Sequence, residues 1–274
     1  MIDLHLHTTA SDGLSTPLEL VDKAAAAGLT VMAVTDHDTT AAVAEVRSLA
    51  RARGIEAVPG IEITAVDAGR DVHMLGYFID PDEPSFLEFL AVQREARIRR
   101  IELIGERLAE LGVPIDVGPM VDVVRSQPGR AIGRPVLARA MLAAGHVASL
   151  QEAFDEWLGD GCQAFVPRIG PTPEVVIDVV HKGGGLVSLA HPARTKVAKR
   201  IPELRDAGLD ALEVFHWDHD AELVAHYSGL AADLGLLVTG GSDFHGDASH
   251  APSPGSVTLP ADAWARLRAA RHGV

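Results

Sequence analysis

Short apolar runs alternate with amphipathic stretches over the first 80 residues. The apolar runs predict strands over residues 2–6, 30–35, 55–58, 61–65 and 72–79. Apolar residues at helical spacing predict helices over 17–28 and 39–53. Thr16 can cap the first of these helices, and Pro17 suits its first turn. This part of the chain therefore reads as repeated strand–helix units.

The pattern changes near residue 83. Residues 84–112 form one long helical pattern, rich in Arg and Glu, which ends at Gly112. Shorter helices are predicted over 119–126, 135–145 and 149–159, and no strand alternation is visible among them. We therefore predict that residues 83–164 form a helical insert, or cap domain. Residues 1–82 and 165–274 would then be two parts of one α/β domain.

The strand–helix rhythm resumes near residue 172. The predicted strands are 186–190, 211–215 and 236–240. The predicted helices are 173–183, 196–207, 220–235 and 261–272. Repeated units of this kind favour a mainly parallel sheet, either open or closed into a barrel.

Composition is consistent with such a fold. Of the 274 residues, 47% are hydrophobic but only 4% are aromatic, so small aliphatic side chains do most of the packing. The single cysteine, Cys162, excludes an intrachain disulfide and fits a reducing compartment. The sequence shows no signal peptide pattern and no run of about 18 uncharged apolar residues. We therefore expect a cytoplasmic protein without a membrane partner.

The net charge of −14 disfavours electrostatic binding of duplex DNA over a broad surface. It does not exclude a small anionic substrate, because bound divalent cations can supply local positive charge. The sequence leaves the oligomeric state open.

Histidines and carboxylates cluster at or just beyond the carboxyl ends of the predicted strands. In parallel α/β folds this edge gathers the active site. His5 and His7 are two residues apart on a strand, so both point to one face. Six imidazoles and three carboxylates suit Zn, Mn or Fe, and nine ligands exceed the needs of one ion. The candidates are His5, His7, Asp12, His37, Glu62, His73, His191, Asp243 and His245.

Each of these residues alone is weak evidence. A single histidine at a strand end more often packs than binds metal, and Asp36 or Asp38 could cap the next helix. Asp12 could likewise begin a turn with Gly13. The conjunction of His-x-His, Asp-x-His and the motifs between them carries the prediction of a metal site.

These motifs together resemble those of the PHP (polymerase and histidinol phosphatase) family. The matching segments are His5-Leu6-His7, Ser11-Asp12-Gly13, Thr35-Asp36-His37-Asp38, Pro59-Gly60-Ile61-Glu62, Ala190-His191-Pro192 and Gly241-Ser242-Asp243-Phe244-His245. The resemblance implies a distorted (β/α)7 barrel with a helical insert domain. It also implies a centre of three divalent metal ions, commonly Mn, Zn or Fe.

The resemblance further implies a division of the ligands among the three ions. The first ion would take His5, His7, Glu62 and Asp243, and the second would take Asp12, His37 and His245. The third would take Glu62, His73 and His191, with Glu62 as a bridge.

The insert resembles the TrpH/YciV-like branch of the family. The matching segments are residues 133–139 and 152–158, and residues 213–216 followed by His219 also match. Members of that branch include a 3′,5′-nucleotide bisphosphatase and a 5′→3′ exoribonuclease for short RNA. Branch members often have histidine after Arg-Pro, where this chain has Val136, which bears on the exact substrate.

The predicted activity is hydrolysis of phosphate from nucleotides or short oligonucleotides by a hydroxide that bridges two ions. Asp12 is predicted to be essential for this step. Arg134 and Arg194 are candidate phosphate contacts, although each could be a surface arginine. His216 could contact the substrate and donate a proton to the leaving oxygen, or it could support a ligand. The arginines of 94–107 are expected to pair with glutamates on the helix surface.

Two alternatives stay open. One is a phosphatase for a small non-nucleotide metabolite such as histidinol phosphate. The other is a metal-binding module without catalytic activity, against which the complete ligand set argues. Phe154 and Trp157 of the insert could stack on bases or could be core residues. His146, His181, His226, His250 and His272 are predicted not to be ligands.

Overall fold

Seven strands form one curved sheet in the order of the chain. The computed structural model describes residues 1–195, 197–246 and 252–271. The predicted non-ligands His250 and His272 lie outside these residues. The strands are β1 (Ile2–Leu6), β2 (Val31–Val34), β3 (Glu56–Asp67), β4 (Arg70–Tyr77), β5 (Leu186–Leu189), β6 (Ala211–Phe215) and β7 (Leu237–Gly240).

The sheet is nearly closed into a barrel. A parallel bridge joins Leu6 at the end of β1 to Phe244 just after β7, and the His7 amide donates to the Phe244 carbonyl at 3.0 Å. The pairs β1–β2, β2–β3, β5–β6 and β6–β7 are parallel, whereas β3–β4 and β4–β5 are antiparallel. The expected distorted (β/α)7 barrel is confirmed, and the antiparallel β4 is one of its distortions.

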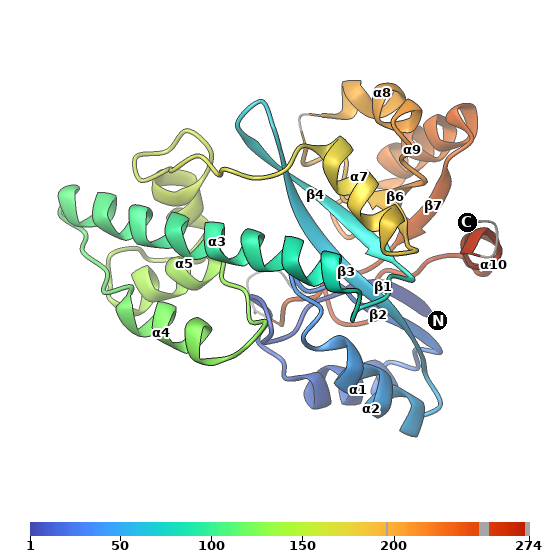
Figure 1. The fold of residues 1–274 in the computed structure, drawn as a ribbon, viewed down its shortest axis with the longest axis horizontal. Coiled ribbons are helices and arrows are strands. Elements are labelled where there is room, and N and C mark those ends of the chain that lie inside the picture. The colour runs from blue at the N-terminus through green and yellow to red at the C-terminus, as the bar shows by residue number, and fades with distance from the viewer. Residues whose placement is uncertain (196, 247–251, 272–274) are drawn as a thin grey trace.

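Helices surround the barrel on its outer face (Figure 1). Their apolar sides pack against the strands, so the core consists mostly of aliphatic residues such as Val43, Ile61 and Val176. These helices are α1 (Pro17–Ala26), α2 (Val43–Ala52), α7 (Pro173–Lys182), α8 (Ile201–Asp206), α9 (Ala221–Leu234) and α10 (Ala261–Ala270), with a short 3₁₀ turn η2 (Ala198–Arg200) before α8.

A second group of helices lies to one side of the barrel, coloured green to yellow in Figure 1. Its own hydrophobic cluster includes Ile101, Leu137 and Met141. The group comprises α3 (Pro84–Glu110), α4 (Gly118–Ser126), α5 (Arg134–Ala143), α6 (Leu150–Glu152) and the π-helix η1 (Ala153–Leu158). Within the described ranges, no helix combines the length and apolar character that a membrane span requires.

Local sequence signals explain several element ends. Thr16 and Glu19 form a capping box at the start of α1, where Thr16 Oγ1 accepts from the Glu19 amide. Asp220 caps α9, and Gly235 ends it in the left-handed conformation.

Some predicted elements differ from the structure. Residues 55–58 and 61–65 were expected as two strands, but β3 runs unbroken through Pro59-Gly60. Gly60 permits this because a Cβ there would lie 2.9 Å from the Val34 carbonyl oxygen of the neighbouring strand. The helix expected over 149–159 is one short α-helical turn followed by the π-helix η1.

Candidate metal centre

Nine side chains converge at one end of the barrel, next to a cavity that residues of the insert also line. His5 lies on β1 and His7 just after it, while His37, His191 and Asp243 follow β2, β5 and β7 respectively. The other four are Asp12, Glu62, His73 and His245. The antiparallel direction of β4 places His73 opposite Thr64 in β3, and so at the same edge as the others.

Glu62 lies at the centre of this cluster and is buried. Its Oε2 lies 3.2 Å from Nε2 of both His5 and His7, and 3.3 Å from Nδ1 of His37. Three imidazoles therefore face one carboxylate oxygen.

The other oxygen of Glu62 faces two more imidazoles. Oε1 lies 2.9 Å from Nδ1 of His73 and 3.2 Å from Nε2 of His191. The two oxygens thus point at different groups of nitrogens, which is the arrangement expected of a bridging carboxylate.

Two aspartates complete the cluster. Asp243 Oδ1 lies 3.3 Å from Nε2 of both His5 and His7, and 3.5 Å from Nδ1 of His245. Asp12 Oδ1 lies 3.3 Å from His245 Nε2, and Asp12 Oδ2 lies 3.7 Å from His37 Nε2. Asp12 and Asp243 therefore approach opposite ring nitrogens of His245.

These donors fit divalent metal ions. Nitrogens of His7, His37 and His191 are buried and form no hydrogen bond within the described part of the chain, although carboxylate oxygens lie close to several of them. A buried polar atom without a partner is costly, and coordination of a cation would satisfy it. Donor atoms within 4.8 Å of one another form three groups: His5, His7, Glu62 and Asp243; His7, Asp12, His37 and His245; and His37, Glu62 and His73.

The carboxylates of the centre are held in the charged form. Burial alone would raise the pKa of Asp12, but the imidazoles of His37 and His245 lower it well below its usual value. The same opposition lowers the pKa of Glu62 and of Asp243 well below their usual values. Burial lowers the pKa of His37 to about 3, which leaves its nitrogens free to act as ligands.

Two buried carboxylates hold the ligands in place without belonging to the nine. Glu213 Oε1 lies 2.8 Å from His5 Nδ1, and Glu213 Oε2 accepts from the His191 amide at 2.8 Å. Asp36 accepts from the Thr8 amide and from the Ser11 hydroxyl, and so fixes the loop that carries Asp12. Sequence reasoning gave Glu213 no role of its own. The one sequence signal for it is its place at the start of the matching segment 213–216, which ends at His216.

Backbone geometry at the centre is unusual. His191 and Asp243 have φ of 26° and 52°, in a region that residues other than glycine seldom adopt. Such strain concentrates at functional sites. At Gly13 a Cβ would lie 2.7 Å from the His7 carbonyl carbon, so only glycine fits beside the first ligand segment.

His216 lies behind Asp243. Its Nε2 is 3.3 Å from Asp243 Oδ2, and its Nδ1 contacts Asp218 Oδ1. Asp218 also accepts from Arg194, whose guanidinium lies 4.7 Å from the centre of the Trp217 ring. Arg194 Nη1 in turn lies 4.0 Å from Asp243 Oδ2, so Arg194 borders the metal centre.

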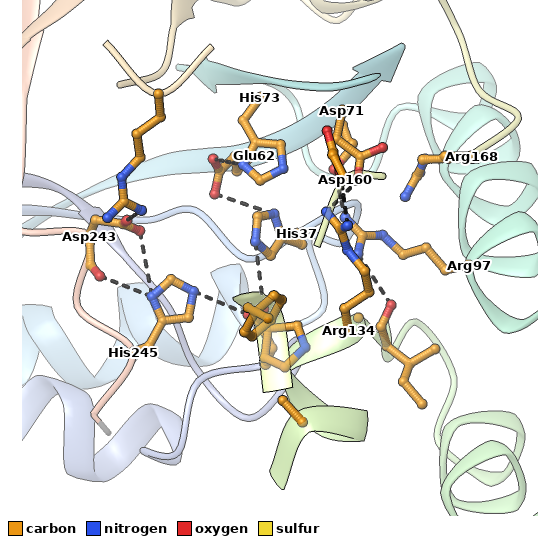
Figure 2. Close-up of a pocket in the computed structure, with 18 of the residues that line it drawn as sticks. His37, Glu62, Asp71, His73, Arg97, Arg134, Asp160, Arg168, Asp243 and His245 are labelled. Carbon is orange, nitrogen blue, oxygen red and sulfur yellow. Dashed lines mark hydrogen bonds and ion pairs between the residues drawn. The ribbon is translucent and has the colours of Figure 1, made fainter. Parts of the chain in front are cut away.

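A cavity of about 530 Å³ opens from the centre toward the insert. Figure 2 shows His37, Glu62, His73, Asp243 and His245 on one side, and Arg97, Arg134 and Arg168 together with Asp71 and Asp160 on the other. Asp71 accepts from Arg100 at 2.7 Å and from Arg134 at 3.1 Å, and Arg100 Nη2 is buried without a partner in residues 1–195, 197–246 and 252–271. The apolar part of the wall comes from Ile101, Ile132, Pro135, Ala138, Leu150 and Phe154.

The expectation for the arginines of 94–107 is wrong in part. Arg97 and Arg100 are buried and pair with Asp38 and Asp71, because this stretch of α3 faces the barrel. Arg99 does pair with Glu102 on the helix surface, at 3.3 Å. Neither Asp36 nor Asp38 caps α2, whose N-cap is Ala42.

Comparisons with known proteins agree with this geometry. Residues 3–114 match the model of the PHP domain. The chain is 36% identical over 250 residues to the 5′-3′ exoribonuclease Rnm of Escherichia coli, covering 89% of this chain and 84% of that protein. It is 32% identical over 250 residues to the 3′,5′-nucleoside bisphosphate phosphatase of Chromobacterium violaceum, covering 89% and 87%. A proposed metal-dependent phosphoesterase from Bifidobacterium adolescentis superposes with a TM-score of 0.88 at 34% identity, covering 98% and 95%.

Proposed function

The chain belongs to the PHP family of metal-dependent phosphoesterases, and from this premise we propose that it hydrolyses phosphate from nucleotides or short RNA. The observation that carries the proposal is the shared cavity. One side presents seven of the nine candidate metal-ligand side chains, and the other presents arginines and an apolar wall. A phosphorylated nucleoside needs all three surfaces, whereas a compact metabolite needs fewer.

Three divalent ions, Mn, Zn or Fe, would be held by the nine residues. His5, His7, Glu62 and Asp243 surround one position. Asp12, His37 and His245 surround a second, which His7 also borders. For the third, both His73 and His191 face Glu62 Oε1, and His37 faces Glu62 Oε2. Ions bound there would lower the pKa of water and neutralise the phosphoryl oxygens.

The protein itself orients the substrate. Arg134 lies at the start of α5 on the cavity wall, and Arg194 lies near Asp243. A guanidinium can hold a phosphate by two parallel hydrogen bonds. The apolar wall that includes Ile132 and Phe154 offers a dry surface for the base. The insert contacts the candidate metal centre directly, because Arg139 donates to the Asp12 carbonyl at 3.1 Å.

His216 supports Asp243 in this scheme. It contacts the aspartate but does not line the described cavity. Of the two roles left open for His216, orientation of Asp243 is therefore the better supported, and direct contact with the leaving oxygen is the weaker.

A substrate panel with Mn²⁺ tests the proposal. The panel contains mononucleotides, 3′,5′-bisphosphates, short RNA and histidinol phosphate. We expect the highest kcat/KM among the nucleotides or short RNA. Asp12→Ala and Asp243→Ala should abolish turnover, whereas Asp22→Ala on the exposed surface should not. Preference for histidinol phosphate, or normal turnover by a folded Asp12→Ala protein, would reject the proposal.

Arg134 has a matched control in Arg130, which does not line the cavity and pairs with Gln127. Loss of a charged hydrogen bond costs about 1.5–3 kcal/mol, or roughly 10- to 100-fold. Arg134→Met should therefore raise KM for the preferred nucleotide by that factor, and Arg130→Met should leave KM unchanged. Equal effects of the two variants would contradict a phosphate contact at Arg134.

A further inference from the structure

A fourth cluster of ligand atoms lies in the turn after β6, outside the nine-residue centre. It consists of His216, Asp218 and His219, whose candidate donor atoms lie within 4.8 Å of one another. The His219 amide donates to the His216 carbonyl at 3.0 Å, so the turn brings the two imidazoles to the same side.

His219 supplies the observation that points to a ligand. Its side chain is fully buried, and its Nε2 has no hydrogen-bond partner among the residues that the structure describes. Its Nδ1 lies 2.9 Å from the Val214 carbonyl oxygen, which can only accept, so Nδ1 carries the proton. The lone pair is therefore on Nε2, which lies 3.8 Å from Asp218 Oδ1. A histidine fixed by a bond from one nitrogen to a backbone carbonyl is the usual form of a metal ligand.

The other two residues offer matching donors. Asp218 Oδ1 faces both imidazoles, while its Oδ2 accepts from Arg194. Ligating carboxylates are commonly held in this way by a second partner. His216 Nδ1 contacts the same Oδ1, and its Nε2 faces Asp243. Asp218 is 21% exposed, so an ion can reach the turn from solvent.

We propose that His216 Nδ1, Asp218 Oδ1 and His219 Nε2 form a further site for one divalent transition-metal ion, with Zn²⁺ as the best match. Two imidazoles, one carboxylate and a water complete a tetrahedral shell. The ion is separate from the three assigned above. When the ion binds His216 Nδ1, the proton of the imidazole stays on Nε2. Nε2 then donates to Asp243 Oδ2 and fixes the orientation of Asp243.

Zinc content of the full-length chain tests the site. The protein is stripped with chelator, reloaded with Zn²⁺, desalted and analysed by mass spectrometry of the metal. His219 is the residue to change, because it contacts none of the nine ligands. We expect His219→Gln and Asp218→Asn each to bind one equivalent less than wild type. His226→Gln, on the neighbouring helix α9, is the matched control and should bind as wild type.

The difference between variants does not depend on activity or on how many ions the nine-residue centre holds. The proposal therefore fails separately from the proposed function. Unchanged zinc content in either variant overturns it and leaves the three residues as a hydrogen-bonded support for Asp243. Anomalous diffraction from a zinc-loaded wild-type crystal should also place a peak about 2.0–2.1 Å from His219 Nε2. Absence of that peak, with peaks at the main centre, overturns it as well.

Discussion

At the scale of residues, the candidate centre depends on side chains that do not face the cavity. His5 can present Nε2 to the centre because Glu213 holds its Nδ1. The same carboxylate accepts from the His191 amide, so it sets two ligands that belong to different strands. A carboxylate behind a metal-bound histidine fixes the tautomer and raises the basicity of the ligand.

Glu213→Gln should therefore weaken metal binding without unfolding the protein. The amide keeps the shape of the side chain but removes the charge that faces His5. We expect the apparent Mn²⁺ affinity to fall roughly 10- to 100-fold, the usual effect of losing such a partner. Activity titrated against Mn²⁺ measures the change, and full recovery at high Mn²⁺ identifies a positioning role. A loss of activity that Mn²⁺ does not restore would contradict it.

The sequence predicted nine candidate ligands and offered support of a ligand as one role of His216, but it gave no such role to Glu213 or Asp36. Motifs such as His5-Leu6-His7 indicate metal ligands through the local spacing of their residues. Glu213 and Asp36 act through contacts with segments distant in the sequence, and local spacing does not reveal such contacts. The nine residues converge in the structure, while the assignment of three ions to them stays a prediction.

At the scale of elements, α3 joins the insert to the barrel through buried charges. Arg97 of α3 and Arg168 both pair with Asp38, at 2.5 and 2.8 Å. Arg100 of α3 and Arg134 of α5 both pair with Asp71 of β4. The helical pattern of 84–112 predicted the length of α3 well. It did not reveal which arginines face the barrel, because that depends on where the helix lies against strands distant in sequence.

The Asp71 pairs predict a pH-dependent contribution to stability. Burial raises the pKa of Asp71, but Arg100 and Arg134 outweigh it and lower the pKa from 3.8 to about 2. The charged form is therefore favoured in the folded protein. The stability that charged Asp71 contributes is therefore present at pH values above its pKa in the unfolded chain, and it is lost as pH falls from 4 toward 2.

We expect Asp71→Asn to lower the free energy of unfolding by about 1.5–3 kcal/mol at pH 7. The difference from wild type should shrink steadily between pH 4 and pH 2. Urea unfolding across this pH range measures it. Asp178→Asn, which removes an exposed pair with Lys182, is the control and should have little effect. A difference that stays constant down to pH 2 would show that the charge of Asp71 is not responsible.

At the scale of the whole molecule, the candidate centre draws on both ends of the barrel sheet. His5 lies on β1 and His7 just after it, and Asp243 and His245 follow β7. The same ions would therefore contact the first and last strands, next to the bridge between Leu6 and Phe244. The boundaries of the insert at 83 and 164 stay a prediction, although its helices have a hydrophobic cluster of their own.

Removal of metal should lower the melting temperature. An ion present at 100 times its dissociation constant stabilises the folded state by about 2.7 kcal/mol. For a chain of this size, that corresponds to roughly 5–10 °C for each such ion. Thermal unfolding with and without EDTA measures the shift. The Asp243→Ala variant lacks one candidate ligand near the first and last strands of the barrel. EDTA should therefore lower its melting temperature by less than that of wild type. Equal melting temperatures with and without EDTA would contradict the role of metal in holding the barrel.

The closure of β1 against the segment after β7 also bears on biosynthesis. The first ligands, His5 and His7, leave the ribosome long before Asp243 and His245 are made. Until then the early histidines lack the aspartate and histidine that complete their surroundings. Synthesis must therefore pass residue 245, and that segment must clear the exit tunnel, before the complete centre can load its ions.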